Sequence, residues 1–147
     1  MLQENYEITI VGRQTVDGQN DEVRVDTLGD YNERNGNLYI SYDEYENDAP
    51  YTSHRKILKI EPTGVVTMFS PGTQTRLILE KGKRHKCMYD TGAGILSLGV
   101  FTQTLRHDLT PVGGELRIQY TLDIDAHLSS RNEILVKLKK RSTASEN

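Results

Sequence analysis

The segment 115–124 alternates strictly between apolar and polar side chains. Apolar or aromatic residues occupy every second position, and in order they are Leu116, Ile118, Tyr120, Leu122 and Ile124. Successive side chains of a β-strand point to opposite faces, so the segment predicts a strand with one buried face and one solvated face. This pattern indicates a sheet that covers one of its faces, which an antiparallel sheet does by curling or closing.

Other short segments repeat the alternation, and turn residues separate them. The expected strands cover about 6–12, 23–31, 38–43, 54–60, 65–69, 75–80, 84–91, 95–105, 115–124 and 133–140. Asn35-Gly36 lies between two of them and is a strong hairpin signal, because a type I′ turn requires positive φ. Residues 45–52 include Pro50 and are expected to form a loop. All four prolines fall in predicted turns, as they should if the strands are real.

Short links join the expected strands in meander order. Closing such a sheet removes its exposed edges, so the sequence predicts an all-β fold, an antiparallel up-and-down β-barrel of about eight to ten strands. At 147 residues the chain is expected to form one domain, over residues 1–141. Residues 142–147 are expected to form a disordered tail.

Composition limits the classes of partner. A net charge of −3 offers no general attraction to nucleic acid or to an anionic membrane, so neither is expected as a partner. The one cysteine, Cys87, excludes an internal disulfide and suggests a reducing compartment. The first residues carry no secretory signal, and no apolar run is long enough to span a bilayer. A cytoplasmic monomer or homodimer is therefore expected.

Residues 90–93, Asp-Thr-Gly-Ala, match the active-site signature of retroviral-type aspartic proteases, in which two aspartates share one proton across a dimer. Three features oppose that interpretation. No glycine follows Gly114 to end the apolar segment that should brace the aspartate loop, 89 residues precede Asp90, and Gly94 stands where that family has an acidic or hydroxyl side chain. An ordinary turn is the simpler interpretation. The protease, acting through Asp90, is kept as a remote alternative.

Metal and nucleic-acid sites have weaker signals. His85 and Cys87 share a strand face, but a zinc site needs two further ligands and the other histidines are isolated in the sequence. Basic residues cluster at 81–86 and 137–141, and strand edges protected by lysine explain both clusters. No metal, no cofactor and no enzymatic activity are expected.

The tyrosines are a better candidate for binding. Tyr42, Tyr89 and Tyr120, together with Glu44, lie on faces that are expected to point into the barrel. A barrel of about eight strands either fills its interior with side chains or leaves room for one small ligand. These four residues are the candidate lining of a ligand site. The alternative is that the tyrosines are large core residues with satisfied hydroxyls.

Longer stretches of the chain resemble a known family. The residues that carry the resemblance are Leu-Tyr-Ile-Ser-Tyr-Asp-Glu at 38–44, Thr52, Lys-Ile-Leu-Lys-Ile at 56–60, Tyr-Asp-Thr-Gly-Ala-Gly at 89–94, Thr102, Gly114, Leu116 and Tyr120. Over about residues 5–140 the chain resembles the YwiB-like bacterial domain of unknown function, a lipocalin-like (calycin-like) β-barrel. Ser70-Pro71-Gly72 departs from that pattern, which has an arginine before the glycine. The resemblance implies a barrel and a turn at 90–92, and it carries over no catalytic or binding residue.

These features together predict a cytoplasmic, non-enzymatic, lipocalin-like barrel that binds a small molecule in its interior. The alternative is a filled barrel that acts as a protein-interaction or structural module through an outer face with Tyr39 and Tyr45.

Overall fold

The computed structural model describes residues 4–46, 49–125 and 127–142, and for 45–46 and 49–53 it describes the backbone only. All regular secondary structure within these ranges is β-strand. In the same ranges, no helix has the length and apolarity that crossing a membrane requires. The expected tail at 142–147 lies outside the described residues except for Ser142.

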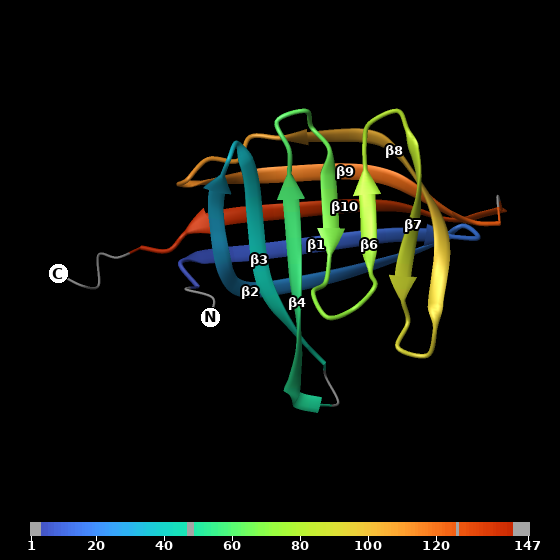
Figure 1. The fold of residues 1–147 in the computed structure, drawn as a ribbon, viewed down its shortest axis with the longest axis horizontal. Coiled ribbons are helices and arrows are strands. Elements are labelled where there is room, and N and C mark those ends of the chain that lie inside the picture. The colour runs from blue at the N-terminus through green and yellow to red at the C-terminus, as the bar shows by residue number, and fades with distance from the viewer. Residues whose placement is uncertain (1–3, 47–48, 126, 143–147) are drawn as a thin grey trace.

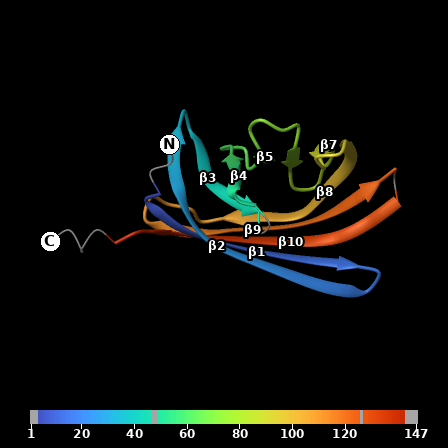
Figure 2. The same cartoon turned by 90° about the horizontal axis from the view of Figure 1, so that it is seen from below.

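Ten antiparallel strands form a closed barrel (Figure 1). They are β1 (Tyr6–Val16), β2 (Gln19–Arg34), β3 (Asn37–Glu46), β4 (Ala49–Ile60), β5 (Val66–Phe69), β6 (Arg76–Leu79), β7 (Arg84–Asp90), β8 (Ile95–His107), β9 (Gly113–Ile124) and β10 (His127–Lys140). Each strand pairs with its neighbours in sequence, and β1 also pairs with β10. The predicted all-β, up-and-down barrel is confirmed. Figure 2 shows β9, β10 and β1 on one side of the core, with β4, β5 and β7 on the other.

Strand β1 closes the barrel because both of its edges are paired. Tyr6 lies opposite Lys140 of β10 and opposite Gly29 of β2, and both ladders run along nearly all of β1. The described ends of the chain therefore meet at one end of the barrel, where the backbone N–H of Arg141 donates to the carbonyl of Asn5 at 2.9 Å. Strand β1 keeps no free edge for another chain to join.

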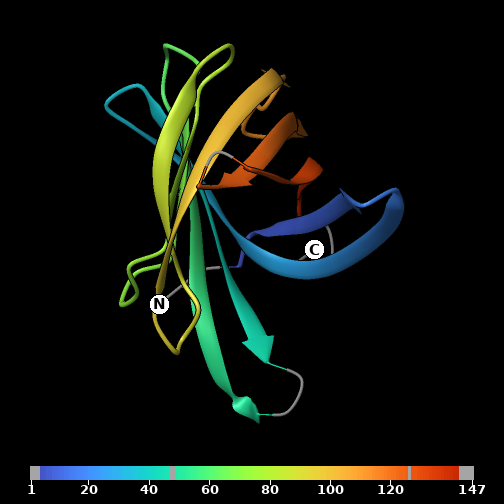
Figure 3. The ribbon, with the colours of Figure 1, turned by 90° about the vertical axis from the view of Figure 1, so that its right-hand side faces the viewer.

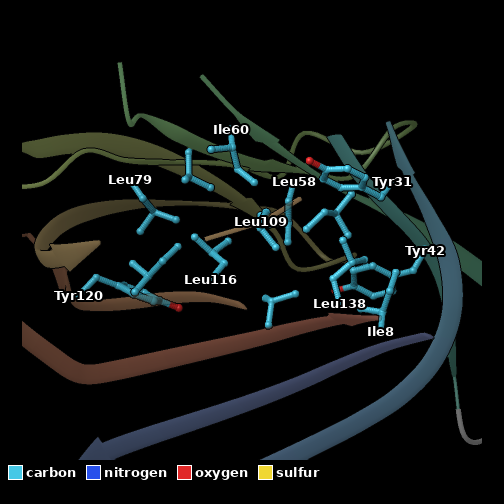
Figure 4. Close-up of a cluster of buried hydrophobic side chains, with 14 of the residues drawn as sticks. Ile8, Tyr31, Tyr42, Leu58, Ile60, Leu79, Leu109, Leu116, Tyr120 and Leu138 are labelled. Atoms are coloured by element: carbon cyan, nitrogen blue, oxygen red, sulfur yellow. The ribbon is translucent and has the colours of Figure 1, made fainter. Parts of the chain in front are cut away.

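Inward-pointing side chains fill the middle of the barrel with one apolar cluster (Figure 4). Its apolar members below 2 % exposure are Ile8, Ile40, Ile60, Val66, Leu79, Val100, Leu116, Ile118 and Val136. They alternate with more exposed residues along most of their strands, as the 115–124 pattern predicts. Each contributes about 1.5–3 kcal/mol by burial, so this cluster is a main stabilising feature of the fold.

The loop between β8 and β9 covers the end of the barrel at which the described chain ends meet. Its Leu109 is 8 % exposed and belongs to the core cluster. The hydroxyl of Tyr6 donates to the carbonyl of Pro111 at 2.8 Å and ties this loop to β1. The ring of Tyr6 also packs edge-to-face against Tyr31, with 5.6 Å between the ring centroids. Apolar side chains thus occupy this end as well as the middle.

Strands β1 and β2 are longer than the sequence predicts. Strand β1 continues past Gly12 to Val16, and β2 begins at Gln19 instead of near Val23. The extra residues form a hairpin end that projects beyond the core, and most of their side chains are exposed on both faces. A strand that is wet on both faces shows no hydrophobic alternation, so the pattern could not reveal it.

The prediction of a loop at 45–52 is wrong. Strand β3 reaches Glu46 and β4 begins at Ala49, so Pro50 lies in a strand rather than in a turn. Residues 47–48 lie outside the described residues. Proline is tolerated near the start of a strand, where its missing N–H removes no essential ladder hydrogen bond.

Side chains complete the barrel between β6 and β7, where the backbone ladder has only the pair Arg76 and Met88. The backbone N–H of Ile78 donates to Sγ of Cys87 at 3.2 Å. The N–H of Asp90 donates to Oγ1 of Thr75 at 3.1 Å, and the N–H of Gln74 donates to Oδ2 of Asp90 at 3.3 Å. Asp90 therefore helps to join β6 to β7.

Gly29 marks the place where β2 passes from β1 to β3. It lies opposite Tyr6 on β1 and opposite Tyr42 on β3. A Cβ atom here would overlap the carbonyl oxygen of Ser41 and would lie 2.6 Å from Cδ1 of Ile8. Only glycine allows the backbones of β2 and β3 and the core side chain to approach this closely.

Replacing Gly29 with alanine is expected to lower the free energy of unfolding by about 3 kcal/mol or more, because the β3 backbone must move. Gly12→Ala is the control, since a Cβ there meets no heavy atom within 4 Å. Its stability should stay within about 0.5 kcal/mol of the wild type. Urea unfolding measures both, and equal losses would contradict the role given to Gly29.

Replacing Asp90 with asparagine is expected to weaken the protein at neutral pH and to have less effect in acid. Hydrogen bonds from the backbone N–H groups of Gly92 and Gln74 lower the pKa of Asp90 below 3.8. The carboxylate therefore stabilises the fold above that pH, and this contribution disappears as the pH falls through the lowered pKa. Urea unfolding between about pH 7 and pH 2 tests this, with Asp17→Asn in another hairpin turn as the control. A deficit that is independent of pH would contradict the prediction.

Candidate functional site

A groove of about 780 Å³ lies on the barrel wall where the β1–β2 and β9–β10 hairpins project. These hairpins reach the right-hand end of the molecule in Figure 1, which faces the viewer in Figure 3. Strands β1, β2, β8, β9 and β10 contribute its lining, which consists of Arg13, Gln14, Thr15, Asn20, Asp21, Glu22, Gln103, Gln119, Tyr120, Thr121, Leu128, Arg131, Asn132 and Glu133. A groove of this volume is large enough for a small organic molecule.

Alternation along the strands places the groove on the outer face of the barrel. On β1 the buried Ile8 points inward, so Arg13 and Thr15 point outward. On β10 the buried Val136 points inward, so Arg131 and Glu133 point outward. Most of the lining side chains therefore lie on the outer face, while Gln14, Asp21, Tyr120 and Asn132 border the groove from inward positions of the same strands.

The first row of side chains across the groove, defined as Glu22, Arg13, Glu133, Gln119 and Thr104, is joined by hydrogen bonds from end to end. Arg13 donates to Glu22 at 2.7 Å and to Oε1 of Glu133 at 3.1 Å. Gln119 donates to Oε2 of Glu133 at 3.2 Å and accepts from the hydroxyl of Thr104 at 2.9 Å. The hydrogen bond to Glu22, with the charges of both carboxylates, raises the pKa of Arg13. Each oxygen of Glu133 thus accepts one hydrogen bond.

The second row lies two residues further along β1, β2, β9 and β10, and one residue further on β8, where a bulge shifts the register; it is defined as Asn20, Thr15, Arg131, Thr121 and Gln103. Thr15 donates to Oδ1 of Asn20 at 2.6 Å, and Gln103 donates to Oγ1 of Thr121 at 3.4 Å. Arg131 lies opposite Thr15 on β1 and Thr121 on β9. Among the described residues it has no ion-pair partner, in contrast to Arg13.

A polar row also faces inward at this end of the barrel. Thr102, Tyr120, Asn132 and Gln14 lie opposite one another on β8, β9, β10 and β1. The hydroxyl of Thr102 is fully buried and has no hydrogen-bond partner within the described residues. Burial raises the pKa of Tyr120 to about 12. The interior thus changes from apolar to polar next to the strand segments that carry the groove.

The four residues predicted to line one ligand site do not meet. Tyr42 and Tyr120 are each 8 % exposed and lie at opposite ends of the side chains drawn in Figure 4. Burial, with a smaller effect of the Glu44 charge, raises the pKa of Tyr42. Glu44 is exposed, and Tyr89 is 44 % exposed near the tip of the β7–β8 hairpin. Of the four, only Tyr120 borders the groove.

Asp90 lies at the end of β7, next to the turn at 91–94. Its Oδ1 accepts the backbone N–H of Gly92 at 2.9 Å, while Oδ2 accepts that of Gln74. These bonds lower the pKa of Asp90, whereas two aspartates that share a proton raise the pKa of one of them. The surroundings of Asp90 are those of a turn residue.

Part of the basic cluster at 81–86 is paired with carboxylates. Nε2 of His85 lies 2.9 Å from Glu80, and Lys83 pairs with the same carboxylate at 3.3 Å. Arg84 pairs with Asp123 at 2.6 Å. Within the described part of the chain, no three His, Cys, Asp or Glu side chains lie close enough together to hold a metal ion.

Sequence reasoning missed the groove. Its lining residues are far apart in the chain, and only strand register brings Thr15 and Thr121 beside Arg131. The stretches 11–16 and 127–132 carry no alternation that would have assigned their faces. Polar side chains concentrated on two hairpin ends were the one available signal.

Replacing Tyr120 with phenylalanine is expected to make the protein more resistant to alkali. The folded state holds the pKa of Tyr120 at about 12, against 10.0 in the unfolded chain. Stability is therefore unaffected below about pH 10 and falls as the pH rises toward 12, by about 3 kcal/mol in total. Urea unfolding at several alkaline pH values measures the slope, which should be shallower in the variant. Identical slopes would show that Tyr120 ionises without unfolding.

Comparisons with known proteins agree with this architecture. The family described as "Domain of unknown function (DUF1934)" matches residues 8–136. The crystal structure of the ywiB protein from Bacillus subtilis superposes with a TM-score of 0.81 at 17 % sequence identity, over 93 % of this chain and 92 % of that one. At this identity the likeness establishes the fold alone. No curated protein matches the chain. The family match spans most of the barrel, so this chain belongs to the DUF1934 family of domains of unknown function.

Proposed function

We propose that this domain is a non-enzymatic binding protein that holds a small polar molecule in its outer groove. The observation that carries the proposal is Arg131, a guanidinium without an ion-pair partner among the described residues, in a groove of about 780 Å³. Neighbouring strands hold its polar surroundings in place through the hydrogen bonds of the first row. A preformed concave surface with a few fixed polar groups is typical of small-molecule sites.

The packing of the interior favours the groove over the barrel lumen. Apolar side chains from both sides of the barrel occupy its middle, and Leu109 joins them from the β8–β9 loop. Tyr42 and Tyr120, the two buried members of the predicted lining, belong to this same cluster. A ligand in the lumen would have to displace well-packed side chains, whereas a ligand in the groove displaces only solvent.

The charged groups of the groove support binding rather than catalysis. Glu22 and Glu133 are both engaged by Arg13, at 2.7 and 3.1 Å. Neither carboxylate therefore stands free of the protein's own hydrogen bonds to act on a bound molecule. Asp90, the residue of the protease alternative, has a lowered pKa, whereas a general acid or base needs a pKa near the working pH.

A second candidate function is docking of a protein through the β7–β8 hairpin. Met88, Tyr89, Ile95 and Leu96 are between 37 and 48 % exposed around its tip. Exposed apolar side chains that gather in one place are typical of interaction surfaces. The interaction face suggested by the sequence included Tyr39, which is half-buried, and Tyr45, whose side chain lies outside the described residues. In either case, the lone, buried Cys87 supports a reducing compartment such as the cytoplasm.

Native mass spectrometry of freshly purified protein is the experiment that tests the groove. Thr121→Trp would fill the groove, and Ser97→Trp on the exposed face of β8 is the matched control. We expect the wild type and Ser97→Trp to retain a small molecule that is released on denaturation, and Thr121→Trp to lose it. Retention by all three proteins, or by none of them, would count against the groove. A bound protein that Tyr89→Ser abolishes would favour the second candidate.

A further inference from the structure

The proposed groove contains one place where a charged side chain and hydrogen-bond donors lack partners. We infer that the second row binds the carboxylate of a singly charged organic acid, with Arg131 as the fork that holds it and Leu128 beneath its apolar part. This inference rests on the proposed function and names the ligand chemistry of the same groove. Its central observation is the different pairing of the two groove arginines.

Among the described residues, Arg131 forms no ion pair with the carboxylate next to it on the same face. Glu133 lies two residues along β10 and so points the same way. However, its Oε1 accepts from Arg13 and its Oε2 accepts from Gln119. These bonds hold the carboxylate toward Arg13 and Gln119, and among the described residues Arg131 makes no ion pair with it, so the guanidinium is available for a ligand. A guanidinium matches a carboxylate with two parallel hydrogen bonds.

The second row holds hydrogen-bond donors that its own hydrogen bonds leave available. Oγ1 of Thr121 accepts from Gln103 at 3.4 Å, which leaves the threonine hydrogen free to be donated. Oδ1 of Asn20 accepts from Thr15, so the two side-chain N–H groups of Asn20 take no part in that bond. A carboxylate accepts hydrogen bonds only, so it complements a row of this kind.

The charges of the outward-facing lining limit the ligand to about one negative charge. Arg13 and Arg131 balance Glu22 and Glu133 exactly one for one, and Asp21 alternates onto the inner face. A monoanion at Arg131 faces one nearby carboxylate, Glu133, whose charge Arg13 already shares. A dianion such as phosphate would meet stronger repulsion from the same group, so a carboxylate fits better than a phosphate.

Leu128 supplies an apolar contact beside the charged group. It lies opposite Asp123, an outward-facing residue of β9, and a bulge then separates it from Ser130. Its side chain is 59 % exposed although it lines the groove. An acid with a short apolar chain would cover Leu128 while its carboxylate meets Arg131, and the gain would grow with the apolar area covered.

Isothermal titration calorimetry of the full chain with hexanoate, acetate and inorganic phosphate tests this inference. Hexanoate is expected to bind more tightly than acetate, and acetate at least as tightly as phosphate. Arg131→Gln should lower the affinity for hexanoate by about tenfold or more. Arg131→Lys should lose less affinity than Arg131→Gln but stay below the wild type, because lysine lacks the planar guanidinium that donates two parallel hydrogen bonds. Leu128→Ala should lower the affinity for hexanoate to nearly that for acetate.

Arg106→Gln is the matched control. Arg106 is an exposed arginine of β8 outside the groove, and its replacement removes the same net charge. Tighter binding of phosphate, equal losses in Arg131→Gln and Arg106→Gln, or no saturable binding of any probe would overturn the carboxylate assignment. Unchanged thermal unfolding of each variant shows that the fold is intact.

The two proposals can fail separately. If Thr121→Trp releases a ligand retained from the cell while Arg131→Gln leaves hexanoate binding unchanged, the groove is a binding site and the carboxylate assignment is wrong. If hexanoate binding depends on Arg131 but no protein retains a cellular ligand, the carboxylate assignment is supported. The proposal that the groove holds a small molecule retained from the cell is then contradicted.

Discussion

The pairing of β1 with both β2 and β10 is the constraint on which the rest of the structure depends. It joins the first and last strands of the chain and turns a meander into a closed ladder. Closure gives every strand an inner and an outer face. Side chains that point inward must therefore be apolar, and the alternate side chains that point outward must tolerate water. Gly29 makes this closure possible, because β2 must follow β1 and then β3 with no side chain between the backbones.

Closure also separates stability from binding. The inward residues of β1 to β10 pack into one apolar cluster, which leaves the centre of the barrel filled. The hairpins of β1–β2 and β9–β10 extend past that cluster, so the side chains at their ends do not pack in it. Their strands twist, as β-strands do, and the outer face becomes hollow where five strands cross it. Polar chemistry can vary there without disturbing the core.

How far the sequence could predict the molecule depended on burial. Where one face is buried, as at Leu116, Ile118 and Tyr120, the alternation named the strand and its inward side chains correctly. Where both faces are wet, as beyond Gly12 on β1, the strand was not visible. Hydrophobic patterning reports contact with a core, and the end of β1 has little. The extension of β4 was missed for another reason, because Pro50 and its polar neighbours in the sequence indicate a loop.

The candidate site was harder to predict than the fold, because register decides it. Tyr42 and Tyr120 were correctly expected on inward faces, yet they lie at opposite ends of the core. No local pattern indicates that the cross-strand neighbours of Arg131 are Thr15 and Thr121 rather than carboxylates. The amino-acid sequence by itself determined an all-β meander with one apolar face per strand, since alternation and turn chemistry are local properties. Only the tertiary structure decided which polar side chains share a row across five strands, since cross-strand neighbours are set by ladder register and by closure.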